Sequence, residues 1–143
     1  GAPYWFFMFH MIQRQRITIV YERAPAMSTL NEELQFFGSS IGLFNLRDKD
    51  KSSFRIFIEL LKAAKVNHPL SSDELAFHLG LTRATVVHHL NKMMESGLVV
   101  SNENKYVLRN ASLAGLLDEL EADYSRATKE LKKIAIKIEE DLG

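Results

Sequence analysis

The chain has 143 residues, of which 46% are apolar and 25% are charged, and its formal net charge is zero. This composition predicts one globular domain with appendages, and it excludes a strongly basic protein whose affinity for nucleic acid would follow from charge alone. The lack of cysteine excludes disulfides and thiolate metal sites and favours an intracellular, cytoplasmic protein. No apolar run reaches the length of a membrane span, so we expect no membrane partner.

Residues 1–27 form an N-terminal extension with an aromatic run at residues 4–9. Further along, Ile17, Ile19 and Tyr21 alternate with Thr18 and Val20, which predicts a strand that ends at Pro25. Two interpretations stay open. The extension precedes a natural start at Met27, or it is an arm that pairs with a partner subunit.

Two helices are predicted between residues 28 and 66. Ser28 is expected to cap the first helix, whose apolar residues repeat at steps of four and three, the spacing of a helix-packing seam. These residues are Leu30, Leu34, Phe37, Ile41 and Phe44. Asp50 is expected to cap the second helix, which carries the apolar stripe Phe54, Phe57, Ile58 and Leu61.

The stretch 71–100 contains two short amphipathic helices joined by a tight turn. Ser71 and Glu74 have the spacing of a capping box, and Gly80 is suited to end the first helix. Thr82 begins the second helix, Gly97 ends it, and its expected buried face is Val86, Leu90 and Met93. A helix, a turn near glycine and a second helix form the helix-turn-helix layout, in which the second helix can enter the DNA major groove.

Two features favour DNA as the partner. The exposed side of the helix 82–96 is polar and carries no acid before Glu95. After it, two strand-prone runs flank a polar turn at residues 101–104, which predicts a two-stranded wing with Lys105 and Arg109 on its return strand.

The segment TRATVVHHLNKMMESGLVV resembles the recognition helix of ArsR-type winged-helix repressors. Those proteins show a Thr-Val, two histidines and a leucine, followed by an apolar position and Gly-Leu-Val. The resemblance covers roughly Ser53 to Arg109. It implies a mainly α, α+β fold: a winged helix-turn-helix domain at 28–110 with its preceding helix, and a long C-terminal dimerisation helix at 111–143. It also implies that the first and last helices form the dimer interface.

The C-terminal helix carries about three heptads of apolar positions, capped at Asn110 or Ser112. A domain of this size cannot cover a helix of about 45 Å. The alternatives are packing against the helix 28–44 or a homodimer, and the homodimer is favoured. The expected interface residues are Leu34, Phe37, Ile41, Leu117, Leu120, Tyr124, Ala127, Leu131, Ile134 and Ile138.

A homodimer of this kind would place two recognition helices on a near-palindromic site in double-stranded DNA. The predicted DNA contacts are Thr82, Arg83, Thr85, Val87, His88, Asn91, Lys92, Asn104, Lys105 and Arg109. Arg83 suits a bidentate guanine contact and Val87 a thymine methyl, although ArsR-type proteins usually have a small polar residue at the second of these positions. The lysines and Arg109 suit phosphates.

No catalytic residue, metal site or cofactor is predicted. The sequence has no glycine-rich phosphate loop, nucleophile elbow or His-Glu-x-x-His pattern, and its paired carboxylates lie on polar helix faces. Because His88 and His89 are adjacent on a helix, they point about 100° apart and cannot both face one metal. The alternative function is a winged-helix protein-interaction module without specific DNA binding, favoured by the zero net charge and by Val87.

Overall fold

The computed structural model describes residues 14–143, so the aromatic run at 4–9 lies outside the described residues. By their internal contacts the residues fall into two units, Gly1–Ala111 and Ser112–Gly143. The described elements are α2 (Leu30–Ser40), α3 (Ser52–Lys65), β1 (Leu70–Ser71), α4 (Ser72–Leu79), α5 (Arg83–Ser96), β2 (Val99–Asn102), β3 (Lys105–Leu108) and α6 (Leu113–Leu142).

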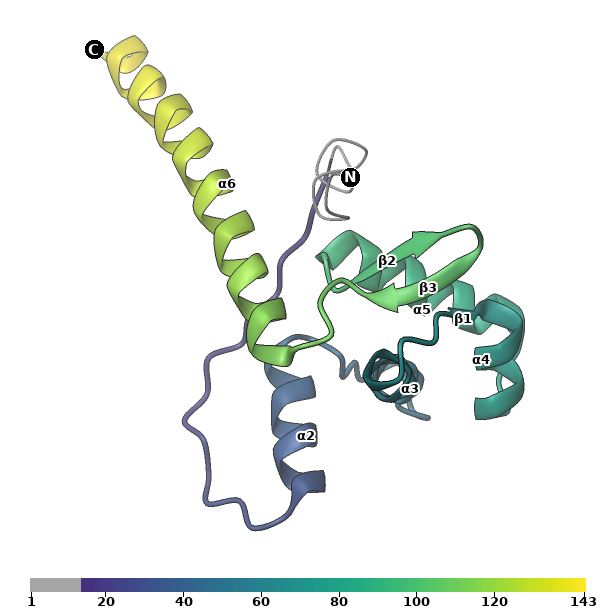
Figure 1. The fold of residues 1–143 in the computed structure, drawn as a ribbon. Helices are drawn as coiled ribbons and strands as arrows, with labels where there is room; N and C mark the ends of the chain where they lie inside the picture. The colour runs from purple at the N-terminus through teal and green to yellow at the C-terminus, as the bar shows by residue number, and fades with distance from the viewer. Residues whose placement is uncertain (1–13) are drawn as a thin grey trace. The chain divides into compact units, whose positions relative to one another are not determined.

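The core of the first unit is formed where α3, α4 and α5 pack with the small sheet (Figure 1). α3 supplies Phe57, Ile56 and Leu60, all at most 1% exposed, while Leu75 comes from α4 and Leu90 from α5. Three antiparallel strands follow the order β1-β3-β2. The predicted winged helix with its two-stranded wing is therefore confirmed, with the two-residue β1 added at the far edge of β3.

α2 packs on α3 through aromatic rings. Phe37 on α2 lies 6.5 Å from Phe57 on α3, measured between ring centroids. In the segment that follows α2, Phe44 lies 4.9 Å from Phe54 of α3. α2 is shorter than the predicted helix 28–44, because it begins after Thr29 and ends at Ser40. Thr29, rather than Ser28, is the N-cap, since its side chain accepts a hydrogen bond from the backbone N–H of Glu32.

The start of α3 also differs from the prediction. The N-cap position is Lys51, which has a left-handed backbone with φ of 55° and makes no capping hydrogen bond. The carboxylate of Asp48, not Asp50, accepts from the backbone amides of Ser52 and Ser53 at 2.9 and 3.0 Å. Asp48 thus satisfies the first amides of the helix from outside it.

The strand predicted around residues 17–21 is wrong. Residues 14–28 form neither helix nor strand, and Ile19 and Tyr21 are 58% and 93% exposed. The segment is held at separate points, including the hydrogen bond from the backbone amide of Val20 to the carbonyl of Ser40 at 2.8 Å. Among residues 14–143, no strand lies beside this segment to pair with its alternating apolar residues.

The second unit is one helix of 30 residues, α6, in agreement with the predicted length. Ser112 is its N-cap, accepting from the backbone N–H of Gly115 at 3.1 Å. Leu116, Leu120 and Asp123 are buried, and Asp123 pairs with Arg126. Every residue from 129 to 143 is exposed. No helix in the described part of the chain has the length and apolar character needed to cross a bilayer.

Candidate DNA-binding surface

The helix-turn-helix forms through local capping. The Ser71 hydroxyl accepts from the backbone N–H of Glu74 at 3.0 Å, and the Glu74 carboxylate accepts from the backbone N–H of Ser71 at 3.2 Å. The predicted capping box is therefore confirmed. Gly80 ends α4 with φ of 66°, and the backbone N–H of Leu81 returns to the carbonyl of Ala76 at 3.0 Å.

α5 begins where predicted, with Thr82 as N-cap accepting from the backbone N–H of Thr85 at 3.1 Å. It ends at Gly97, whose φ of 86° suits glycine. Val86 and Leu90 are fully buried and Met93 is 2% exposed, which confirms the predicted inner face. The opposite face is thereby left to solvent.

The predicted DNA contacts differ in their exposure. Seven of them are exposed: Thr82, Arg83, His88, Asn91, Lys92, Asn104 and Lys105. Thr85 and Val87 are partly buried on the flanks of α5. Arg109 is only 8% exposed and follows the end of β3, where its backbone N–H donates to the carbonyl of Leu98. This buried position does not fit a contact between Arg109 and a phosphate, so Arg109 is not among the proposed DNA contacts.

Arg83 is engaged at the surface. Its Nε atom lies 3.5 Å from the carboxylate of Asp73 at the start of α4, and both side chains are largely exposed. Exposed ion pairs of this kind contribute about 0–1 kcal/mol. The guanidinium can therefore leave Asp73 at little cost when a stronger acceptor is near.

The wing is a tight hairpin. Glu103 and Asn104 both have left-handed backbones, with φ of 52° and 65°, and they form a two-residue connection between β2 and β3. The turn is narrower than the predicted 101–104, because Ser101 and Asn102 belong to β2. Lys105 lies opposite Asn102 on β2 and Ser71 on β1, and it is exposed.

Sequence reasoning missed the contact between the N-terminal segment and the end of α5. The backbone N–H of Arg16 donates to the carbonyl of Glu95 at 3.1 Å, and their side chains pair at 3.6 Å. The Gln15 side chain donates to the carbonyl of Ser96 at 3.4 Å. These bonds satisfy carbonyls in the last turn of α5. No local pattern could predict them, because the partners lie about eighty residues apart in the chain.

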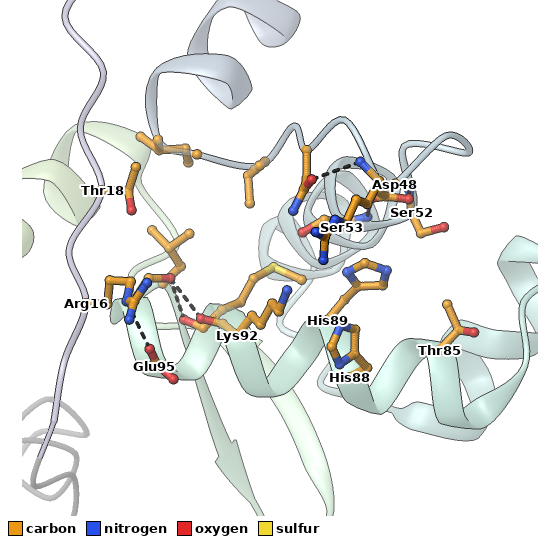
Figure 2. A pocket seen from close by; sticks show the side chains of 18 of the residues that line it. Arg16, Thr18, Asp48, Ser52, Ser53, Thr85, His88, His89, Lys92 and Glu95 are labelled. Atoms are coloured by element: carbon orange, nitrogen blue, oxygen red, sulfur yellow. Dashed lines mark hydrogen bonds and ion pairs between the residues drawn. The ribbon is translucent and has the colours of Figure 1, made fainter.

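A cavity of about 860 Å³ lies beside α5. Figure 2 shows His89 and Lys92 on α5, Asp48 and Ser53 on the opposite side, and Arg16 with Thr18 at one end. Its apolar lining includes Met93 and Ile41. Ile41 directly follows α2 and is 4% exposed. Ile41 therefore faces the interior of this unit and does not fit the predicted dimer interface.

Two groups in this cavity have shifted pKa values. Burial lowers the pKa of His89 below its ordinary 6.5, Asp48 acts against this, and the charges of His88 and Lys92 lower it further. Burial raises the pKa of Asp48, but hydrogen bonds from the amides of Ser53 and Ser52 outweigh burial and leave it below 3.8. At neutral pH, His89 is therefore uncharged and Asp48 is ionised.

Metal ligands do not gather on the described residues. Across residues 14–143, no three His, Asp or Glu side chains are grouped so that they could hold a metal ion. The rings of His88 and His89 meet edge to face with centroids 5.3 Å apart. The residues around α5 therefore offer hydrogen bonds and charge rather than a coordination site.

Comparison with known protein families gives a match over part of the chain. Residues 59–101 match the family described as bacterial regulatory protein, arsR family. The match runs from the second half of α3 through α4 and α5 into β2. No curated protein and no solved structure matches the chain.

Proposed function

Because the chain carries an ArsR-type winged helix-turn-helix, the DNA-binding fold of a non-enzymatic family of transcription regulators, we propose that it binds a specific, near-palindromic DNA site as a homodimer. In this arrangement the two α5 helices enter successive major grooves about 34 Å apart. The protein then acts in the cytoplasm, where bacterial DNA lies. Regulation by a catalytic step has no part in the proposal.

The observation that carries the proposal is the outer face of α5. This face is polar and exposed, it begins at a capped helix start, and a hairpin of wing geometry follows it. The first amides of a helix also favour a phosphate, through hydrogen bonding and the helix dipole.

Each side chain has a distinct role in the proposed complex. Arg83 leaves Asp73 and makes a bidentate contact with guanine, while Val87 contacts a thymine methyl. His88, Asn91 and the partly buried Thr85 reach base edges or the backbone at close approach. Phosphates are contacted by Thr82, Lys92, Asn104 and Lys105.

The homodimer is supported by the apolar residues that α6 leaves exposed. Tyr124 and Leu131 are 63% and 64% exposed, and Ile134 and Ile138 are 56% and 51% exposed. Contiguous apolar stripes of this length mark association surfaces. Leu120, at 3% exposed, and Ile41 do not fit the interface, which leaves Leu34, Phe37, Leu117, Tyr124, Ala127, Leu131, Ile134 and Ile138.

A second candidate function is a protein-interaction module. It is favoured by the balance of charge around α5, because the three cations Arg83, Lys92 and Lys105 are matched in number by the three acids Asp73, Glu95 and Glu103. Arg83 also pairs directly with Asp73. A salt-dependent, sequence-dependent binding measurement separates the two functions, because a protein partner would not confer either property on DNA binding.

The test is fluorescence anisotropy with a labelled duplex taken from upstream of the protein's own gene, beside a scrambled duplex. Salt is varied from about 50 to about 300 mM, where about three to six phosphate contacts per dimer give a shallow slope. We expect preference for the upstream duplex, and we expect Arg83→Ala to lose about 1–3 kcal/mol of that preference.

Lys129→Ala is the matched control, because Lys129 is an exposed cation on α6 away from α5 in sequence. It should keep the preference. Weak binding that is equal on both duplexes and insensitive to Arg83→Ala would contradict the proposal and favour the protein-interaction module.

A further inference from the structure

The cavity beside α5 has the size and mixed lining of a small-molecule site. Its volume of about 860 Å³ lies within the range of about 300–1,000 Å³ typical of such sites. Its walls come from α5, from the segment 45–53 and from Arg16 and Thr18. The lining also includes the side chains of Ile41, Leu43, Met93 and Leu98, so the cavity offers an apolar surface as well as polar groups.

Two of the three acidic side chains that line the cavity, Asp48 and Glu95, already have partners, and the third, Asp50, is exposed. The Asp48 carboxylate accepts hydrogen bonds from the amides of Ser52 and Ser53, one to each oxygen. The carboxylate of Glu95 pairs with Arg16 at 3.6 Å. Arg16 therefore offsets the charge of Glu95, whereas the two amides satisfy the oxygens of Asp48 but leave its negative charge in place.

The cavity also contains cations that a ligand can reach. Within the described residues, no carboxylate lies within 4.0 Å of the Lys92 ammonium, although Glu95 is only three positions further along the same helix. Arg47 adds a second cation to the lining, while Lys49 and Asp50 are exposed and opposite in sign. An anion can therefore pair with Lys92 without first breaking an ion pair, at the modest, solvent-screened energy of an exposed cation.

Hydrogen-bonding capacity lies next to that cation. Figure 2 shows His89 and Lys92 side by side on α5, one turn of helix apart. A neutral His89 has one ring N–H to donate. Across the cavity, Asn45 accepts from the backbone N–H of Arg47 through its side-chain oxygen, which leaves its amide group to donate.

We propose that this cavity binds a small aromatic carboxylate, with the carboxylate at Lys92 and His89 and the ring against Met93 and Ile41. The carboxylate would pair with the Lys92 ammonium. The ring would pack on the apolar lining formed by Met93 and Ile41, where the methionine sulfur favours an aromatic ring. An inorganic anion would fit less well, because it leaves Met93 and Ile41 uncovered. A neutral aromatic molecule would also fit less well, because it leaves Lys92 without an ion pair.

The site has a consequence for DNA binding, and this part rests on the proposed function. Lys92 is a proposed phosphate contact, and His88 beside it is a proposed base or backbone contact. A carboxylate held at Lys92 neutralises that cation, so ligand and DNA compete for it. By linkage, each lowers the affinity for the other by the same factor.

The experiment titrates the full chain with naphthalene-2-carboxylate and follows amide signals by NMR. Saturable shifts are expected at residues 45–53 and 88–96. The corresponding carboxamide should bind about tenfold more weakly, and acetate should not saturate below about 5 mM. Lys92→Met should weaken binding of the carboxylate about tenfold, while Lys92→Arg should stay within about threefold.

Lys129→Met is the control, since it removes an exposed lysine of the other unit. Failure of the carboxylate to saturate below about 5 mM would overturn the proposal. So would equal binding of the carboxamide, unchanged binding by Lys92→Met, or shifts confined to residues 124–138, where the exposed apolar face of α6 would be the site.

Anisotropy with the upstream duplex then separates the two proposals. We expect the carboxylate to weaken binding of the upstream duplex by the native chain, and to have no effect on DNA binding by Lys92→Met. If the native chain binds the carboxylate but shows no DNA preference, the ligand site stands and the proposed function fails. If preference is present but insensitive to bound carboxylate, the competition is wrong.

Discussion

At the scale of single residues, Gly38 is set by packing. Its backbone does not need glycine, but a Cβ at this position would lie 2.7 and 2.9 Å from ring atoms of Phe54 and 3.3 Å from Phe44. Phe54, which has both of the shorter contacts, is 8% exposed and stacks on Phe44, so its ring has little room to move away. The absent side chain is what lets α2 approach the aromatic layer on α3.

We therefore expect Gly38→Ala to lower the free energy of unfolding by about 1–3 kcal/mol, although alanine is the better helix former by about 1 kcal/mol. Urea unfolding followed by circular dichroism measures it. Ser39→Ala, an exposed neighbour in the same helix, is the control and should be neutral or stabilising. A Gly38→Ala variant as stable as the native chain would contradict the packing explanation.

His89 links stability to pH. Its folded pKa lies below 6.5, chiefly because of burial, so between these two pKa values the unfolded chain binds more protons than the folded chain. Stability contributed by neutral His89 is present above about pH 6.5 and is lost as the pH falls toward the folded pKa.

The expected result is that the melting temperature falls between about pH 7 and 5, and that His89→Gln reduces this fall. His78→Gln, which replaces an exposed histidine on α4, should leave the fall unchanged. Equal pH profiles for the native chain and His89→Gln would show that other groups cause the dependence.

At the scale of elements, the start of α3 depends on a residue outside the helix. Asp48 fills the capping role that Lys51 cannot, so Asp48→Asn should cost about 1 kcal/mol at pH 7. The lowered pKa of Asp48 places this contribution above about pH 3.8, and it is lost as the pH falls through the folded pKa.

Unfolding of Asp48→Asn and the native chain at pH 7 and at about pH 3 measures the effect, with Asp50→Asn as the control. The difference between native chain and variant should shrink at the lower pH. An equal loss from Asp50→Asn would restore Asp50 as the cap that the sequence predicted.

The same element shows why some boundaries were predictable and others were not. α4 and α5 begin at N-caps whose hydrogen-bond partners lie three residues away in the sequence: Ser71 with Glu74, and Thr82 with Thr85. The α3 cap requires Lys51 to take a left-handed backbone, which nothing in its side chain favours.

The cavity, and the contact between the N-terminal segment and the end of α5, could not be predicted from the sequence for a different reason. Both depend on contacts between distant segments, such as Arg16 with Glu95, and periodicity says nothing about such pairs. The burial of Ile41 had the same origin. The sequence placed Ile41 on the exposed seam of a helix 28–44, whereas α2 ends at Ser40 and Ile41 is 4% exposed.

At the scale of the whole molecule, the proposed dimer rests on the apolar stripe of α6. Leu131 is 64% exposed, so a charge placed there changes little in a single chain. In the proposed dimer the same charge would be buried in the apolar interface with no opposite charge to pair with. We expect Leu131→Glu to weaken dimerisation about a hundredfold, and with it the affinity for a two-part DNA site.

Sedimentation equilibrium measures the dimer constant. Lys132→Glu is the control, because it adds a negative charge at the next residue, which is polar and exposed. A native chain that sediments as a monomer at about 100 µM would rule out the proposed homodimer, and an equal effect of Lys132→Glu would assign the loss to charge rather than to the apolar stripe.

The exposed end of α6 also bears on how long the protein lasts in the cell. From residue 129 onward every side chain is exposed, and a helical segment of this length is marginal in water without a partner. In a lone chain the end of the helix opens locally and can be cleaved by a protease, whereas pairing covers it. We therefore expect turnover to be fast when the protein is scarce and slow once it has accumulated. Dimerisation would thereby make the lifetime of the protein depend on its own concentration.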